Sequence, residues 1–201
     1  MHLKKLPRSF YLRPTLNVAR KLLGAYLCRR VRGKTLIGRI VEVEAYLGEL
    51  DPASHAYRGK TKRNEVMFWN GGHLYVYFTY GMHFCSNVVT EREGIGRAVL
   101  LRAIEPVAGI EIMKKNRKLN TTTLHNLTNG PAKLCQALGI TRPENGADLC
   151  GRKIWIGRDS SERLRQLIKR STRIGITDGK DHRWRFYLGG NHFVSRTKPV
   201  R

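Results

Sequence analysis

Two acidic residues stand in an otherwise apolar stretch of this sequence. Glu42 and Glu44 belong to the run Ile40-Val41-Glu42-Val43-Glu44-Ala45-Tyr46, in a chain with only 15 Asp and Glu against 38 Lys and Arg. A carboxylate that loses hydration among apolar side chains becomes more basic, as a general base requires. The alternative is that this face of the segment is simply wet, and the residues alone leave both interpretations open.

Two further polar residues stand in apolar segments. Arg102 lies between Leu101 and Ala103, and a buried arginine is usually paired with a carboxylate, for which Glu44 is a candidate. Asn87 is either a buried amide with its hydrogen bonds satisfied or a group that sets specificity.

Aromatic residues gather in the same part of the chain. Tyr75, Tyr77 and Tyr80 could form, together with His55, a pocket that stacks on a planar base. The alternative is ordinary core, because tyrosines are common in strands.

The segment Tyr80-Gly81-Met82 is unusual for the tip of a hairpin, where Gly, Asn and Asp are preferred. Large apolar groups exposed on a basic protein suit insertion between base pairs from the minor groove. The alternative is a tip that folds back onto the core.

No metal or cofactor is expected. His73 and His83 lack the spacing and companions of a metal pair. The four cysteines are far apart and include no CxxC pair, which favours free thiols in a reducing cytoplasm.

Local patterns predict the elements that position these residues. We expect helices over Thr15–Leu23, Val107–Lys118 and Pro131–Leu138. We expect strands over Ala25–Arg32, Thr35–Tyr46, Leu74–Thr79, Phe84–Thr90, Arg97–Ile104, Lys153–Ile156, Thr172–Thr177 and Trp184–Leu188. With no repeat or linker, residues 1–201 are predicted to form a single α+β domain dominated by antiparallel strands.

Charge indicates the partner. The net charge is +23, and the segment from Arg152 to Arg201 has 14 basic and 4 acidic residues interleaved with aromatic ones. Such a folded basic surface favours nucleic acid. An acidic membrane is the second choice, but no basic amphipathic helix, membrane span or signal peptide is apparent.

Several blocks of sequence resemble the alkyladenine (3-methyladenine) DNA glycosylase family. They are Arg39–Gly48, Asp51–His55, Met67-Phe68, Leu74–Met82, Phe84–Asn87, Val99–Pro106, Gly130–Leu138, Arg173–Ile176 and Trp184–Tyr187. The match runs in order from about Ser9 to Ser195, almost the whole chain.

The resemblance implies both fold and chemistry. Glu44 matches the family's general base, which deprotonates the attacking water, and Arg102 matches the arginine that helps to hold that water and the glutamate. The implied fold is an α+β domain around a curved antiparallel sheet with a protruding hairpin. At the tip of that hairpin, Tyr80 matches the intercalating residue and Met82 lies beside it.

The resemblance also implies a base-binding pocket. Tyr46 matches the aromatic residue that stacks on one face of the flipped base, and His55 and Tyr77 match the pair on the other face. Asn87 matches the side chain that crowds the exocyclic amino group of normal guanine.

The sequence thus predicts a monofunctional glycosylase of base excision repair that flips alkylated or deaminated purines from duplex DNA and hydrolyses the N-glycosidic bond. We expect a monomer in the bacterial cytoplasm, at the nucleoid, with no obligate protein partner. The alternative is a non-enzymatic minor-groove or RNA-binding protein. A bifunctional lyase would need an amine nucleophile; Lys133 is the nearest candidate and is interpreted as structural or phosphate-contacting.

Overall fold

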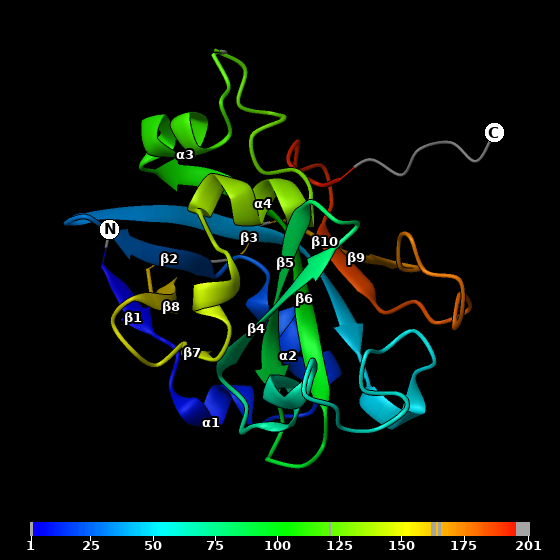
Figure 1. Ribbon diagram of the computed structural model, residues 1–201. Helices are drawn as coiled ribbons and strands as arrows, with labels where there is room; N and C mark the ends of the chain where they lie inside the picture. The colour runs from blue at the N-terminus through cyan, green and yellow to red at the C-terminus, as the bar shows by residue number, and fades with distance from the viewer. Residues whose placement is uncertain (1, 121, 162–163, 165, 196–201) are drawn as a thin grey trace.

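The computed structural model describes residues 2–120, 122–161, 164 and 166–195. They form an α+β domain on a strongly curved antiparallel sheet (Figure 1). The sheet has the order β1-β8-β2-β3-β6-β5-β4-β7, and β10 pairs with β3 and β9. The strands are Leu3–Lys5 (β1), Tyr26–Val31 (β2), Lys34–Tyr46 (β3), His73–Thr79 (β4), His83–Thr90 (β5), Arg97–Ala108 (β6), Ala147–Asp148 (β7), Ile154–Asp159 (β8), Ile168–Ser171 (β9) and Arg185–Leu188 (β10). The predicted fold class is confirmed.

The helices are short and pack on this sheet. They are Arg8–Tyr11 (α1), Thr15–Leu22 (α2), Ile110–Asn116 (α3) and Pro131–Leu138 (α4). Single turns of 3-10 helix cover Gly48–Leu50, Glu65–Phe68 and Arg142–Glu144. Helix α2 packs against β3 and β6, and α4 packs against β5 and β6. In Figure 1, α3 and α4 lie at the top of the view and α1 at the bottom.

Helix α4 shows why local signals succeed. Pro131 occupies its first turn, where a missing N–H costs nothing, and Gly139 follows its end with φ +66°. The predicted bounds of this helix are confirmed. Between them, Leu134 and Leu138 are fully buried.

Three predictions of secondary structure are wrong: the end of strand β6, the start of helix α3 and the strand expected over residues 172–177. Strand β6 continues through Pro106, which faces Gly38 at a register shift, so the missing N–H interrupts no regular ladder. Helix α3 consequently begins at Ile110, not at Val107. Residues 172–177 are not a strand, because Arg173 turns into the interior and Gly175 takes φ +76°.

Strand β3 is the element that matters most for the candidate site. It pairs along β6, while β2 takes its first half and β10 takes its second half. Two register shifts leave Val41 of β3 and Arg102 of β6 without a partner in the ladder. Such bulges re-aim side chains and are frequent next to active sites.

Candidate active site

Glu44 lies near the end of β3 and has no exposed area. Its Oε1 accepts a hydrogen bond from the Ile174 N–H at 2.8 Å, and its Oε2 accepts one from the Tyr46 hydroxyl at 3.0 Å. Glu42 is likewise fully buried, so the wet-face alternative for the two carboxylates is wrong. Both carboxylates are held in the interior, where charge needs partners.

Arg102 joins the two carboxylates. Its Nη1 lies 3.2 Å from Glu44 Oε1, and its Nε donates to Glu42 Oε1 at 3.1 Å. Burial by itself lowers the pKa of Arg102, but the carboxylates of Glu44 and Glu42 outweigh it and raise the pKa above its ordinary value. The predicted pairing of Arg102 with Glu44 is confirmed.

Glu42 belongs to a second network that the sequence did not reveal. Its Oε1 accepts hydrogen bonds from Arg185 Nε at 2.6 Å and from Ser195 Oγ at 2.7 Å. Its Oε2 accepts the Ser195 N–H at 2.7 Å. Together with Arg102 Nε, these groups make four donors to the Glu42 carboxylate. They come from strands β6 and β10 and from the segment after β10.

A pocket of about 180 Å³ lies at the end of β3. The residues lining it are Tyr46, Ala53, His55, Met67, Tyr75, Tyr77, Thr79, Tyr80, Asn87, Gly175 and Ile176. They come from β3, the loop after it, β4, β5 and the segment after β9. In Figure 1, β4 and β5 lie near the centre of the view, and the other three segments lie to their right. A cavity of about 150 Å³ accepts benzene, so this pocket has room for a small planar group.

Tyr46 connects the pocket with the buried carboxylate. Its ring forms part of the wall, while its hydroxyl donates to Glu44. Burial, and after it the neighbouring Glu44 carboxylate, raises the pKa of Tyr46 far above its ordinary value. The hydroxyl therefore stays protonated and remains a donor.

Three rings form the wall contributed by β4 and the preceding loop. His55 and Tyr77 have ring centroids 4.4 Å apart, and Tyr75 and Tyr77 are stacked at 5.5 Å. His55 Nδ1 is hydrogen-bonded to the Tyr75 hydroxyl at 3.0 Å. Burial, followed by the Arg63 guanidinium, lowers the pKa of His55. The imidazole is therefore neutral at physiological pH.

Asn87 is buried in the pocket wall. It faces Tyr75 in the register of β4 and β5, and its Nδ2 donates to the Tyr75 carbonyl at 3.3 Å. The amide is thus tied to the backbone of the neighbouring strand, which fixes its position.

The hairpin tip is exposed. Strands β4 and β5 are antiparallel with Thr79 opposite His83, and the side chains of Tyr80 and Met82 are 81% and 69% exposed. The alternative in which these groups fold onto the core is therefore wrong. Tyr80 also has φ +50°, a conformation that is uncommon for residues other than glycine. That the hairpin protrudes as a wedge stays a prediction.

Comparison with known proteins identifies the family. The family model described as "Methylpurine-DNA glycosylase (MPG)" matches residues 9–192. A protein of Carboxydothermus hydrogenoformans is 54% identical, covering 95% of this chain and 98% of its own length. One of Alkaliphilus oremlandii is 46% identical, covering 96% and 99%. Both are named "Putative 3-methyladenine DNA glycosylase". This chain belongs to the methylpurine-DNA glycosylase family.

Membership makes the chain a hydrolase that acts on N-glycosidic bonds of DNA, and it decides against the non-enzymatic alternative. The candidate lyase residue Lys133 is not among those lining the pocket of the glycosylase. Its Nζ donates to Asn129 at 2.8 Å, near the start of α4.

One pair of residues near the site escaped the sequence-based prediction. Arg173 and Asp51 form an ion pair with no exposed area on either side chain. The guanidinium lies 4.7 Å from the Tyr46 ring, and the next residue, Ile174, donates to Glu44. The available signal was the place of both residues in blocks that resemble the family, Asp51–His55 and Arg173–Ile176.

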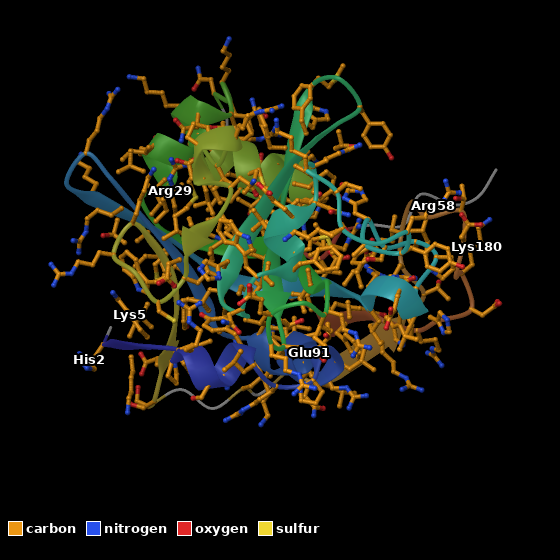
Figure 2. All side chains as sticks on the ribbon, turned by 60° about the horizontal axis from the view of Figure 1, so that its bottom comes forward. His2, Lys5, Arg29, Arg58, Glu91 and Lys180 are labelled. Carbon is orange, nitrogen blue, oxygen red and sulfur yellow. The ribbon has the colours of Figure 1, made fainter. Side chains whose placement is uncertain are left out.

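The surface of the glycosylase is basic on more than one side. In Figure 2, Lys5 lies at one edge of the view, whereas Arg58 and Lys180 lie at the opposite edge. Within the described residues, no helix is long and apolar enough to cross a membrane. The same part of the chain holds no cluster of three His, Cys, Asp or Glu side chains suited to a metal ion.

Proposed function

We propose that this glycosylase flips an alkylated purine out of duplex DNA into the 180 Å³ pocket and hydrolyses its bond to deoxyribose. The observation that carries the proposal is the arrangement around Tyr46. This residue contributes its ring to an aromatic pocket and its hydroxyl to the buried carboxylate of Glu44.

In the proposed binding mode the base stacks between two walls. Tyr46 covers one face, and His55 and Tyr77 cover the other. A purine alkylated at N3 or N7 is cationic, and the electron-rich faces of aromatic rings attract cations. Asn87 crowds the exocyclic amino group that normal guanine carries, so guanine is rejected by bulk.

In the proposed reaction Glu44 accepts a proton from water while the water oxygen attacks C1′. The electrons of the C1′–N9 bond leave with the purine and neutralise its positive charge. Arg102, within 3.2 Å of Glu44, orients the carboxylate. The carboxylate also stabilises the positive charge that develops on the sugar.

The protonation states of the pocket favour a base that is already charged. Burial lowers the pKa of His55, so it is not charged at pH 7. Burial raises the pKa of Tyr75 to about 12 and that of Tyr77 further, so neither is a ready acid. We therefore expect alkylated purines to be released faster than neutral, deaminated ones such as hypoxanthine.

We further propose that residues 1–201 act as one glycosylase domain, as a monomer with no obligate protein partner, in a bacterial cytoplasm at the nucleoid. The net charge of +23 supports binding to the phosphates of undamaged DNA.

A release assay tests this function. Duplex DNA treated with a methylating agent should yield free 3-methyladenine and 7-methylguanine together with an equal number of abasic sites. The strands should remain uncut, because no amine attacks the sugar. Binding to the methylated duplex without any release would contradict the proposal.

Flipping is tested at the exposed tip. Tyr80→Ser should leave the melting temperature unchanged, because the side chain is 81% exposed, but should lower the population of flipped base. The fluorescence of 2-aminopurine next to the lesion reports that population. The matched control is Leu50→Ser, which alters another exposed apolar residue outside the tip. An unchanged signal in Tyr80→Ser would assign Tyr80 to the turn alone.

A further inference from the structure

Tyr46 is the first member of a column of stacked side chains that contains three rings and one guanidinium. The guanidinium carbon of Arg173 lies 4.7 Å from the centroid of the Tyr46 ring and 5.1 Å from that of Trp184. Trp184 in turn stacks on His182, with centroids 3.9 Å apart and an interplanar angle of 5°. The column thus runs from the pocket wall to His182, which is exposed.

A full positive charge therefore lies directly behind the stacking platform. Arg173 does not line the pocket, and its side chain has no exposed area. It consequently covers a part of Tyr46 that faces away from the pocket. A base stacked on the pocket side of Tyr46 would lie roughly 8 Å from the guanidinium, since stacked rings are about 3.5 Å apart.

Asp51 compensates that charge. Its Oδ1 accepts from Arg173 Nη2 at 2.7 Å, and its Oδ2 accepts from Nη1 at 2.5 Å. Backbone N–H groups also fix the carboxylate, that of Ala53 at 3.1 Å and that of Leu47 at 3.3 Å. The pair as a whole is neutral and is held rigidly from the loop that follows β3.

The balance between these two charges matters for the substrate. An uncompensated guanidinium at roughly 8 Å repels a cationic base but not a neutral one. At an effective dielectric constant of about 20, this repulsion lowers the affinity for the cationic base tenfold or more. When Asp51 neutralises the charge of Arg173, the Tyr46 ring has no such bias against a cationic base. Compensation is therefore a requirement for accepting cationic purines on this ring.

We propose that Asp51 and Arg173 are positioning residues that set the selectivity between cationic and neutral damaged bases, by fixing the net charge behind Tyr46. The proposal rests on the proposed function, because it takes the pocket to hold the flipped base. Neither residue touches the base, and both act through the Tyr46 ring.

The test removes the two charges one after the other. In a Glu44→Gln background, which blocks cleavage, affinity is measured for two duplexes that differ only in the lesion, cationic 7-methylguanine or neutral hypoxanthine, because the repulsion acts on the base only while it is still charged. In Asp51→Asn the ratio of the two affinities, 7-methylguanine over hypoxanthine, should fall about tenfold, because Arg173 is left uncompensated. Adding Arg173→Gln to it should restore the ratio. Asp51→Glu, which keeps the charge, is the matched control and should leave the ratio unchanged.

The ratio separates this role from a structural one. Because Arg173 lies 4.7 Å from the centroid of the Tyr46 ring, any displacement of that ring weakens the binding of both lesions and cancels in the ratio. Folded variants that weaken the binding of both lesions equally would overturn the inference. If Asp51→Asn does not fold, Arg173→Gln alone must raise the ratio, since it leaves the carboxylate uncompensated; a ratio that falls or stays constant overturns the inference.

Release of 7-methylguanine by the wild-type protein separates failure of this inference from failure of the proposed function. Failure of the wild-type protein to release 7-methylguanine would contradict the proposed function itself, whereas an unchanged affinity ratio in folded variants contradicts only the role of Asp51 and Arg173.

Discussion

Glu42 and Glu44 are two residues apart on β3, both are fully buried, and both contact Arg102. Their other partners differ. Glu42 accepts one hydrogen bond from Arg185 and two from Ser195. Both residues are distant in sequence from Tyr46, whose ring lines the pocket, and neither of them lines it. Glu44 accepts instead from Tyr46, which does line it. Residue type and burial alone therefore do not distinguish the two carboxylates; their neighbours do, and the neighbours of Glu44 support its place in the proposed reaction.

The largest expected effect comes from Glu44→Gln. Glutamine keeps nearly the same shape, but its single oxygen accepts only some of the hydrogen bonds from Arg102 and Tyr46. It cannot take a proton. Loss of the general base costs on the order of a hundred- to ten-thousand-fold, and loss of the electrostatic stabilisation adds to this. Single-turnover release of 3-methyladenine measures the chemical step, and a gel shift on a lesion duplex measures binding, which should persist.

Glu49→Gln is the matched control, because it removes an exposed carboxylate nearby and should leave release unchanged. Release by Glu44→Gln at the wild-type rate would exclude Glu44 as the base. Loss of binding together with release would point to a structural acid.

Glu42→Gln should instead lower stability. It leaves Arg102 and Arg185 short of a buried carboxylate, and removing one partner of a buried ion pair costs about 3–5 kcal/mol. For a domain of this size each kcal/mol lowers the melting temperature by roughly 2–4 °C. Thermal denaturation followed by circular dichroism measures the effect. A variant that melts like the wild type but releases no base would reverse the roles assigned to the two carboxylates.

The comparison also shows what could be predicted from the sequence. Glu44 and Arg102 both have apolar neighbours in the sequence, which indicates that both are buried. Since a buried arginine needs a carboxylate, this was enough to predict that Arg102 pairs with Glu44. Helix α4 was predicted for a similar reason, since Pro131 and Gly139 mark its ends locally. Such features depend on neighbouring residues alone.

The rest depends on contacts between distant segments. Ser195 is 153 positions from Glu42, and Arg173 is 122 positions from Asp51. Nothing in the local pattern of Thr172–Thr177 distinguishes a strand from the irregular segment that turns Arg173 inward. The register shifts that place Arg102 between the two carboxylates are likewise set by the pairing of β3 with β6 and not by either strand alone.

Tyr46→Phe sharpens the comparison on the Glu44 side. It keeps the ring that forms the pocket wall but removes the hydroxyl that donates to Glu44 at 3.0 Å. A hydrogen bond to a charged group contributes about 1.5–3 kcal/mol, so release should slow by roughly ten- to a hundredfold if the bond orients the reacting carboxylate. Single-turnover release measures this, and lesion affinity should stay close to that of the wild type. An unchanged rate would mean that Arg102 and Ile174 orient Glu44 without the hydroxyl.

Ser195→Ala is the counterpart on the Glu42 side and should have the smallest effect. It removes the Oγ that donates to Glu42 at 2.7 Å but keeps the Ser195 N–H, which donates at the same distance. Glu42 also retains both arginines, so we expect a loss of about 1–2 kcal/mol in the free energy of unfolding and little change in release. Urea denaturation and single-turnover release, measured on the same preparation as Tyr46→Phe, provide a direct contrast. Each variant deletes one hydroxyl donor from one buried carboxylate, and Ser195→Ala also removes the oxygen that accepts from Arg102 Nη2 at 3.4 Å. If Ser195→Ala slowed release as much as Tyr46→Phe did, the Glu42 network would transmit its geometry through Arg102 to Glu44, and the division between a structural and a reacting carboxylate would not hold.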